Sequence, residues 1–357
     1  MNILHISPDL KWSRIFIFPI AEKQSMLGNK VWISTPNDPN IKIDEDLNFI
    51  IVGWTKKYIN FFYYFLSLFL IVYKIHRIKI DEVYAHTTVD SFGYILFIRL
   101  FTRAKITYIN HGVPYSGYAG FLRFILKFFE IININFSHKV LTITSSMATL
   151  LKAVNKFNKE IHVMNPGTLV GVNLYYKSYD ELQKVRNNQL RSNSLRIIYV
   201  GRVEERKGII ELIQAINNSN INCELVVLGG DSNELNIDFD DSKIFFLGFK
   251  SDLSSYYLNS DILCVPSHHE GFGQVYLEAA SFGVIPICCN IPGPTDFIIH
   301  GFNGFVVEPR SANSIILLLK SIERNEFDLE AIRKNSFQSV LRFEKSKVID
   351  SNMVYFK

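Results

Sequence analysis

The sequence is poor in cysteine and has no long uncharged apolar run. These two absences argue against a disulfide-stabilised secreted protein and against a membrane-spanning one. Only four of the 357 residues are cysteine, none in a Cys-x-x-Cys pair, which suits a reducing compartment. No window reaches eighteen uncharged apolar residues, so a membrane-spanning helix is not expected. The first ten residues show no basic segment, apolar run and cleavage site in succession, so we expect a cytosolic protein without a secretory signal.

Charged residues are also scarce, at 20%, while 48% of the chain is hydrophobic. Disorder is therefore excluded, and the length suits two domains. The net charge of +4 is unevenly divided, because 19 Lys and Arg accompany 11 Asp and Glu up to Asn165, whereas 19 accompany 23 beyond it. The basic first half indicates a surface for an anionic partner, either membrane or phosphate, with ordinary solvated charge as an equal alternative.

Short apolar runs typical of buried strands alternate with segments long enough for crossover helices. Seven such runs precede Asn165: Ile3 to Ile6, Val31 to Ser34, Phe49 to Val52, Glu82 to Ala85, Ile106 to Ile109, Lys139 to Ile143 and Ile161 to Met164. Helices are expected between them, as at Phe61 to Ile75 and Ser91 to Phe101. This βαβ rhythm predicts a parallel sheet wrapped by helices over residues 1–165.

The rhythm breaks over residues 166–194, where the polar run Lys184 to Asn193 is interpreted as a connection. Six strand-like runs then follow: Arg196 to Val200, Glu224 to Leu228, Ile244 to Leu247, Ile262 to Val265, Val284 to Cys288 and Gly304 to Val307. Expected helices are Gly208 to Ile216, Gly273 to Phe282 and Ala312 to Ile322.

These runs predict an α/β protein with two tandem doubly wound, Rossmann-like domains, the second over residues 195–336. A helix at about residues 337–357 is expected to pack back on the first domain. Ligands of such sheets bind beyond the carboxyl ends of the strands, so the two domains are expected to face each other across a ligand-binding cleft.

The densest motif lies between Pro266 and Pro309. An apolar strand ends at Val265, and the loop from Glu270 to Gly273 then precedes an amphipathic helix that carries Glu278. Glycine lets the backbone approach a ligand closely, and a helix N-terminus offers unpaired N–H groups to a phosphate. The two carboxylates, eight positions apart, suit sugar hydroxyls, although Glu278 alone could be a first-turn residue that stabilises the helix dipole.

A second motif, Gly201 to Gly208, also joins an apolar strand to a helical run. Arg202 and Lys207 offer the guanidinium fork and the ammonium charge that commonly bind a diphosphate. In the alternative interpretation, Glu204 and Glu205 simply pair with these cations at the surface.

Together these motifs resemble the signature of glycosyltransferase family 4, whose members have the GT-B fold, and the resemblance extends over nearly the whole chain. It is carried by Glu270 and Glu278, Gly201-Arg202, Lys207-Gly208, Ile291-Pro292-Gly293, Gly301 to Phe305, Asp81 to His86 and Asn110-His111-Gly112. Family members commonly have a glycine pair in the first loop, whereas Ser7 to Ser13 contains none. The first loop also lacks the Gly-x-Gly-x-x-Gly of a nicotinamide-dependent dehydrogenase.

The resemblance implies roles for individual residues. Glu270 would contact the donor sugar, and His111 would lie near the reacting centre on the acceptor side, although a lone histidine after a strand is more often structural. The remaining donor-binding residues would be Arg202 and Lys207 for the diphosphate, Glu278 for the ribose, and the backbone of Phe272, Gly273, Gln274 and Val275.

Neither a metal nor a cofactor is expected. Asp44 to Asp46 and Asp238 to Asp241 imitate the Asp-x-Asp motif of metal-dependent glycosyltransferases, but both lie in polar connecting stretches and are interpreted as solvated loops. His268 and His269 lack the His-x-x-x-His spacing of a helical zinc site.

Three apolar segments of the basic half could contact a membrane. Ile59 to Tyr73 is uncharged, Tyr118 to Phe136 contains Arg123 and Lys127, and Phe92 to Arg103 is similar. They are too short to span a bilayer but can lie in its interface, with a role as helices that cover the sheet as the alternative.

The sequence therefore predicts a retaining glycosyltransferase of hexosyltransferase type, which moves a hexose or N-acetylhexosamine from a UDP or GDP sugar to a glycan. The basic, apolar first half favours a polyprenyl diphosphate-linked acceptor at the inner face of the plasma membrane, in O-antigen, lipopolysaccharide or capsule synthesis. Nucleic acid is not an expected partner. The alternatives are a sugar-nucleotide 2-epimerase of GT-B fold and a non-catalytic module that binds nucleotide sugars.

Overall fold

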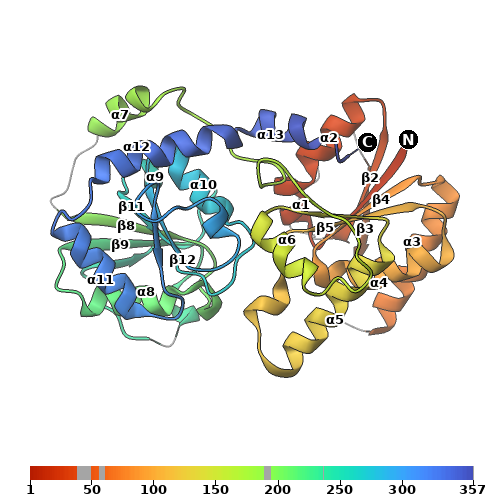
Figure 1. Ribbon diagram of the computed structural model, residues 1–357, viewed down its shortest axis with the longest axis horizontal. Helices are drawn as coiled ribbons and strands as arrows, with labels where there is room; N and C mark the ends of the chain where they lie inside the picture. The colour runs from red at the N-terminus through yellow and green to blue at the C-terminus, as the bar shows by residue number, and fades with distance from the viewer. Residues whose placement is uncertain (38–49, 56–60, 189–193, 236, 357) are drawn as a thin grey trace. The chain divides into compact units, whose positions relative to one another are not determined.

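The computed structural model describes residues 1–37, 50–55, 61–188, 194–235 and 237–356, which form two α/β units (Figure 1). Unit 1 comprises Met1–Val170 and Ser346–Lys357, and unit 2 comprises Gly171–Lys345. The carboxyl-terminal segment thus belongs to unit 1 from Ser346 onward rather than from about residue 337. The reason is that α12 (Leu329–Val340) lies within unit 2, where Phe337 packs against Tyr179 with ring centroids 5.9 Å apart.

Unit 1 contains a seven-stranded parallel sheet with the order β3-β2-β1-β4-β5-β6-β7. Its strands are β1 (Asn2–Ile6), β2 (Lys30–Asn37), β3 (Ile50–Thr55), β4 (Glu82–His86), β5 (Lys105–Asn110), β6 (Lys139–Thr142) and β7 (Ile161–Val163). All seven expected strands are present, although Phe49 lies outside the described residues. The strand order runs in opposite directions on the two sides of β1 and β4, as in a doubly wound sheet.

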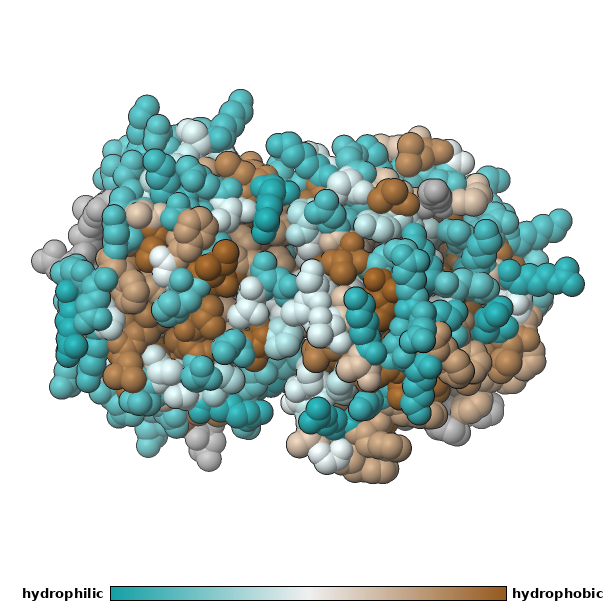
Figure 2. All heavy atoms as spheres, viewed as in Figure 1, coloured by the Kyte–Doolittle hydropathy of each residue, from teal (hydrophilic) through white to brown (hydrophobic). Residues whose placement is uncertain are grey.

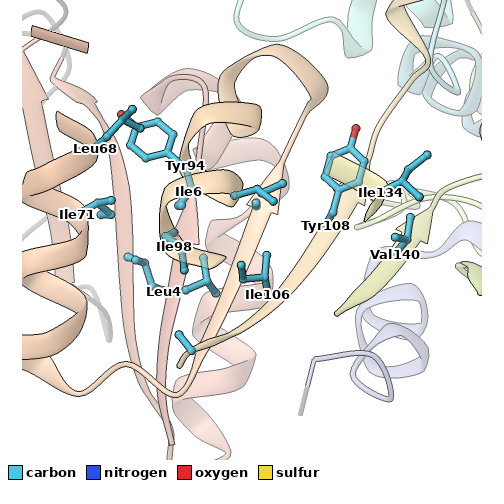
Figure 3. Packing of buried hydrophobic residues seen from close by; sticks show 14 of the residues in the cluster. Leu4, Ile6, Leu68, Ile71, Tyr94, Ile98, Ile106, Tyr108, Ile134 and Val140 are labelled. Atoms are coloured by element: carbon cyan, nitrogen blue, oxygen red, sulfur yellow. The ribbon is translucent and has the colours of Figure 1, made fainter. Parts of the chain in front are cut away.

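Helices cover both faces of this sheet. They are α1 (Leu10–Phe16), α2 (Phe18–Met26), α3 (Phe61–Ile78), α4 (Thr88–Phe101), α5 (Gly120–Phe136), α6 (Ser145–Lys152) and α13 (Lys345–Asn352). Side chains alternate along a strand, so Leu4 and Ile6 share one core with Ile71 of α3 and Ile98 of α4, as Figure 3 shows. The intervening residue, His5, points to the opposite face and contacts α2.

Unit 2 contains a six-stranded parallel sheet with the order β10-β9-β8-β11-β12-β13. Its strands are β8 (Leu195–Val200), β9 (Cys223–Leu228), β10 (Ile244–Phe246), β11 (Ile262–Cys264), β12 (Ile285–Cys289) and β13 (Phe305–Val307). Its helices are α7 (Tyr179–Asn187), α8 (Ile209–Asn218), α9 (Ser254–Leu258), α10 (Gln274–Ser281), α11 (Ala312–Glu323) and α12. All six expected strands are confirmed, so the two predicted doubly wound sheets are present.

The interpretation of Lys184 to Asn193 as a connection is wrong for its first four residues, because residues 179–187 form α7. The Ser178 side chain caps this helix by accepting a hydrogen bond from the backbone N–H of Glu181. Arg186 then docks it by donating to the carbonyl oxygens of Tyr257, Ser260 and Phe282 at 2.7 to 3.3 Å. The polar residues of this segment therefore stabilise a helix rather than a loop.

Among the helices that the structure describes, none has the length and apolar character needed to cross a membrane.

Candidate functional site

The carboxyl edge of the unit 2 sheet brings together the two loops that the sequence motifs occupy. β8 ends at Val200 and β11 ends at Cys264, and these strands are parallel neighbours. The loops that follow them therefore leave the same edge. One loop leads into α8 and the other into α10, so the N-termini of both helices direct unpaired N–H groups toward this edge.

Gly208 allows these two loops to approach each other closely. Its φ is +71°, and a Cβ atom there would lie 2.0 Å from the carbonyl oxygen of Pro266, so only glycine fits. The backbone N–H of His268 donates to the carbonyl oxygen of Arg206 at 3.0 Å, and His268 Nε2 lies 2.8 Å from Glu211 Oε1 on α8. These two contacts join the loop that carries Lys207 to the loop that carries Glu270.

Lys207 and Glu270, one from each loop, form an ion pair in this edge. Lys207 Nζ donates to Glu270 Oε2 at 2.5 Å, and the side chains are only 17% and 18% exposed. Burial alone would raise the pKa of Glu270, but the charge and hydrogen bond of Lys207, with the N–H of Gly271, hold that pKa below its usual value. The Glu270 side chain is therefore ionised at neutral pH.

Arg202 lies in the same loop as Lys207 but is far more accessible, with 68% of its side chain exposed. Its guanidinium contacts Glu204 at 3.1 Å, and Arg206 also donates to Glu204, at 2.9 Å. The surface pairing considered from the sequence is therefore present for Glu204. Such an exposed pair contributes little stability, so Arg202 remains available to a stronger anion.

Glu278 lies in the second turn of α10 and is half-buried. A first-turn role in stabilising the helix dipole is therefore wrong. Tyr257 OH donates to Glu278 Oε2 at 3.3 Å, and burial raises the pKa of Glu278 to about 7 despite this hydrogen bond. Near neutral pH this carboxyl group can thus both accept and donate hydrogen bonds.

The segment from Phe272 to Val275 forms the start of α10 and presents backbone rather than side chains. Phe272 is buried against Phe343, with ring centroids 5.6 Å apart. Gly273 is the N-cap with φ +84°, and the Gln274 side-chain amide donates to the carbonyl oxygen of Gly171. The N–H groups at this helix start are the part of the segment that a phosphate could contact.

His111 belongs to unit 1, whereas the other predicted site residues belong to unit 2. It directly follows β5 and ends a row of side chains that the sequence analysis did not single out. His111 Nε2 lies 3.1 Å from His86 Nδ1, His86 Nε2 lies 3.0 Å from His5 Nδ1, and His5 Nε2 lies 2.8 Å from Gln24 Oε1. A signal existed in the sequence, because each histidine lies at or near the carboxyl end of a predicted strand.

The glycine-free first loop forms α1, and this helix contacts the same histidine. Asp9 caps α1, since its Oδ1 accepts a hydrogen bond from the backbone N–H of Trp12 at 2.7 Å. The Trp12 ring then meets His111 edge to face, with centroids 4.6 Å apart and an interplanar angle of 89°. A helix with an aromatic side chain thus occupies the position where the family resemblance leads one to expect glycine.

A buried hydrogen-bond network holds the backbone on either side of His111, at Asn110 and Gly112. The Asn110 side-chain amide donates to the carbonyl oxygen of Gly112 at 2.9 Å and to Glu130 Oε1 at 3.2 Å. Glu130 comes from α5 and also accepts hydrogen bonds from Thr88 and Tyr108. Burial raises the pKa of Glu130 to about 7, and the hydrogen bonds from Thr88, Tyr108 and Asn110 oppose this shift.

Of the two acidic clusters, Asp44 to Asp46 lie outside the described residues. In the other cluster, Asp240 accepts hydrogen bonds from the backbone and hydroxyl groups of Ser242 at 3.0 and 2.6 Å, in an exposed turn. Across the described ranges, no group of three or more His, Cys, Asp or Glu side chains is placed to hold a metal ion.

Comparison with protein families identifies the domain that contains these loops. Residues 180–339 match the family model described as "Glycosyl transferases group 1". The matched range includes Arg202, Lys207, Glu270 and Glu278 but not His111. Glycosyltransferase activity is therefore supported by the half of the chain that contains both motif loops.

Curated relatives extend the similarity toward the amino terminus. The chain is 29% identical over 256 residues to the capsular polysaccharide biosynthesis glycosyltransferase CapM of Staphylococcus aureus, covering 68% of this chain and 67% of CapM. It is 22% identical to the N,N'-diacetylbacillosaminyl-diphospho-undecaprenol alpha-1,3-N-acetylgalactosaminyltransferase of Campylobacter jejuni, covering 93% of this chain and 92% of that protein.

Solved structures of glycosyltransferases share the fold over the full chain. A glycosyltransferase from Rickettsia africae superposes with a TM-score of 0.74 at 22% identity, covering 100% of this chain and 97% of that one. HepE of Anabaena, in complex with UDP and glucose, gives a TM-score of 0.77 at 16% identity, covering 100% and 99%. The predicted GT-B fold is thus confirmed.

Proposed function

We propose that this protein is a retaining, family 4 type glycosyltransferase that moves a hexose or N-acetylhexosamine from a nucleoside diphosphate sugar to a lipid-linked glycan. The observation that carries the proposal is the buried ion pair of Lys207 and Glu270 beside the N-terminus of α10. Both residues lie within the segment that matches the group 1 glycosyl transferases. The pair places a cation, a carboxylate and unpaired N–H groups at one edge of the sheet, as a phosphosugar requires.

Lys207 and Arg202 would bind the donor diphosphate in different ways. The ammonium group of Lys207 has three N–H donors, and Glu270 occupies one of them. The remaining two can reach phosphate oxygens while Glu270 keeps the ammonium in position. Arg202 is exposed and weakly paired, so a diphosphate can displace Glu204 from it.

The proposed reaction breaks the bond between the anomeric carbon of the donor and its phosphate oxygen. The hydroxyl oxygen of the acceptor bonds to that carbon from the face that the diphosphate leaves, and its proton passes to the departing phosphate oxygen. Configuration at the anomeric carbon is therefore retained. Lys207, Arg202 and the N–H groups of α10 stabilise the negative charge that develops on the leaving group, while Glu270 and Glu278 accept hydrogen bonds from the sugar and ribose hydroxyls.

The names of the relatives support a polyprenyl diphosphate-linked acceptor in capsule or O-antigen synthesis. The Campylobacter jejuni relative is named for a diphospho-undecaprenol substrate, and CapM for capsular polysaccharide. HepE was solved with UDP, which supports a uridine nucleotide as the first donor to test.

The exposed face of α5 supports a position at the inner face of the plasma membrane. Phe121, Phe124 and Phe128 are 77%, 67% and 50% exposed, and the cations Arg123 and Lys127 accompany them. Figure 2 shows apolar side chains gathered over this part of unit 1. The opposite face of α5 is buried, so the helix covers the sheet and still presents phenylalanines beside cations, a combination typical of helices that lie in an anionic membrane interface.

A panel of UDP, GDP and ADP sugars tests the proposal. The donor should raise the melting temperature, because a ligand at 100 times its Kd adds about 2.7 kcal/mol of stability. Radiolabel from that donor should then appear in an undecaprenyl diphosphate-linked sugar. Conversion of the donor without transfer would indicate an epimerase, and binding without turnover would indicate a non-catalytic module. No stabilisation by any nucleotide sugar would contradict the proposal.

A further inference from the structure

A row of four polar side chains crosses the centre of unit 1 at the carboxyl edge of its sheet. β1, β4 and β5 are adjacent in that sheet, and they contribute His5, His86 and, just beyond β5, His111. Gln24 of α2 ends the row on the inner side. The three contacts measure 2.8 to 3.1 Å between nitrogen or oxygen atoms, so every neighbour in the row is joined by a hydrogen bond.

All three imidazole rings are neutral at physiological pH. Burial lowers the pKa of His5 to about 4, with a hydrogen bond to Gln24 opposing the shift, and lowers that of His111 to about 3. Burial and the two neighbouring rings lower the pKa of His86 well below its usual value. A neutral imidazole carries one N–H donor and one lone pair, so a row of such rings must run in a single direction.

His5 Nε2 faces the amide oxygen of Gln24, whose amide nitrogen is buried without a hydrogen-bond partner among the described residues, and this orientation of the amide sets the direction. An amide oxygen only accepts hydrogen bonds, so His5 must donate from Nε2 and keep its lone pair on Nδ1. His86 Nε2 then donates to His5 Nδ1, and His111 Nε2 donates to His86 Nδ1. The lone pair of His111 consequently lies on Nδ1, to which the described part of the chain offers no hydrogen-bond partner.

Aromatic contacts hold the rings in this orientation. Tyr84 stacks on His5 with centroids 5.1 Å apart and 20° between planes. Trp12 meets His111 edge to face at 4.6 Å. Reversal of the row at these fixed ring positions requires the proton on each imidazole to move to its other nitrogen and Gln24 to present its amide N–H to His5 in place of its oxygen.

We propose that Gln24, His5 and His86 are positioning residues that hold His111 in its Nε2-protonated tautomer, so that Nδ1 accepts a hydrogen bond from a substrate hydroxyl. The role toward substrate rests on the proposed function, whereas the tautomer does not. His111 is partly exposed, while His5 and His86 are buried. The substrate hydroxyl would therefore contact His111, the most exposed ring of the row, whose tautomer is determined by Gln24 at the buried end.

Nitrogen-15 NMR of the full chain, labelled at its nine histidines, tests the tautomer directly. Long-range proton–nitrogen spectra distinguish the two neutral tautomers, and single histidine-to-glutamine variants assign the signals. We expect His5, His86 and His111 each to show a protonated Nε2 and an unprotonated Nδ1. A protonated Nδ1 on His111, or a mixture of tautomers, would overturn the proposal.

The variant Gln24→Met removes the acceptor two rings away from His111 at similar volume. We expect His111 to become a mixture of tautomers, and kcat to fall about tenfold with the donor KM unchanged, since a His111 protonated on Nδ1 cannot accept the hydroxyl hydrogen bond and a factor of ten corresponds to about 1.4 kcal/mol. Gln24→Glu keeps an oxygen acceptor and should preserve the tautomer. Ile20→Val, on the same helix and equally buried, controls for packing loss and should leave both spectrum and kcat unchanged.

The two readouts separate the tautomer from the proposed function. An unchanged His111 tautomer in Gln24→Met would overturn the role of Gln24, whatever the activity. If Gln24→Met does not fold, Gln24→Glu and the wild-type spectrum still decide the direction of the row. If no nucleotide sugar supports transfer, the kinetic role fails together with the proposed function, and the NMR result stands alone.

Discussion

At the scale of single residues, the pair of Lys207 and Glu270 determines how the proposed donor site is charged. Glu270→Gln would leave a buried ammonium group without its carboxylate partner, and loss of one charged hydrogen bond costs about 1.5 to 3 kcal/mol. We expect kcat/KM for transfer to fall by about tenfold to a hundredfold, since each 1.4 kcal/mol is a factor of ten. Steady-state kinetics and thermal melting measure the activity and the fold.

Glu205→Gln provides the matched control, because Glu205 is an exposed carboxylate in the same loop as Lys207. Its activity should stay within twofold of wild type, as estimated for a solvated surface charge. Wild-type turnover in Glu270→Gln would remove the basis for the proposed donor site.

A second residue-scale prediction concerns pH. Burial raises the pKa of Glu278 from 4.5 to about 7, so between these values the folded protein holds a proton that the unfolded chain has released. The stabilising contribution of Glu278 is therefore complete below about pH 4.5 and is lost as pH rises through 7. Relative to wild type, Glu278→Gln should gain on the order of 1 to 3 kcal/mol in free energy of unfolding across that window.

Urea denaturation at intervals between pH 4.5 and 8 measures this difference. Glu326→Gln serves as the control, since Glu326 is exposed in the same unit, and its difference from wild type should be flat. A flat profile for Glu278→Gln as well would show that the Glu278 carboxyl group ionises normally.

At the scale of secondary-structure elements, α5 buries one face in unit 1 and exposes phenylalanines on the other, which is the face proposed to contact a membrane. Replacing Arg123 and Lys127 together with Glu should weaken flotation with anionic liposomes by about tenfold or more, because each basic residue near such a surface contributes about 1 kcal/mol. High salt should weaken wild-type flotation too, as screening confines the attraction to about 8 Å at physiological ionic strength. Transfer to a short soluble acceptor should continue.

The control is a double replacement of Lys320 and Lys334 with Glu, which makes the same charge change at exposed positions of unit 2. Flotation of this control should match wild type. Equal flotation of the α5 variant on anionic and neutral vesicles would show that α5 only covers the sheet.

The elements that the sequence predicted are those whose signal is local. β8 and β11 are short continuous apolar runs, and parallel strands buried on both faces have this pattern. α1 was missed because its seven residues are too few to show a helical period. Its Asp9 cap is a local signal, but Trp12 packs against His111, which lies 99 positions away in the sequence. Tertiary contacts of this kind cannot be read from neighbouring positions alone.

The candidate site likewise has a part with a local sequence signal and a part that depends on tertiary contacts. The motif loops could be predicted because Arg202, Lys207, Glu270 and Glu278 lie at characteristic positions after two strands. The contact of His5 with His86 joins residues 81 positions apart, and it depends on the register of adjacent strands. That register becomes visible only when the sheet is assembled.

At the scale of the whole molecule, the charges of the proposed donor site predict that transfer does not depend on divalent metal ions. Lys207, Arg202 and the N-terminus of α10 already supply positive charge for a diphosphate. Transfer should therefore keep at least half its rate in excess EDTA, measured with the same radiolabel assay. Complete loss that magnesium or manganese restores would mean that metal ligands lie elsewhere in the chain.

The division of unit 1 between two distant parts of the sequence also orders its assembly during synthesis. Phe356 packs against Tyr84 at 5.0 Å and near His5 at 6.4 Å, and Lys23 pairs with Asp350 at 2.6 Å. When the ribosome has added Lys345, all of unit 2 has therefore been synthesised, while unit 1 still lacks Phe356, which packs near His5. Nascent domains usually fold from the amino terminus onward, but here unit 1 receives its last segment, Ser346–Lys357, only after the domain encoded between its two parts.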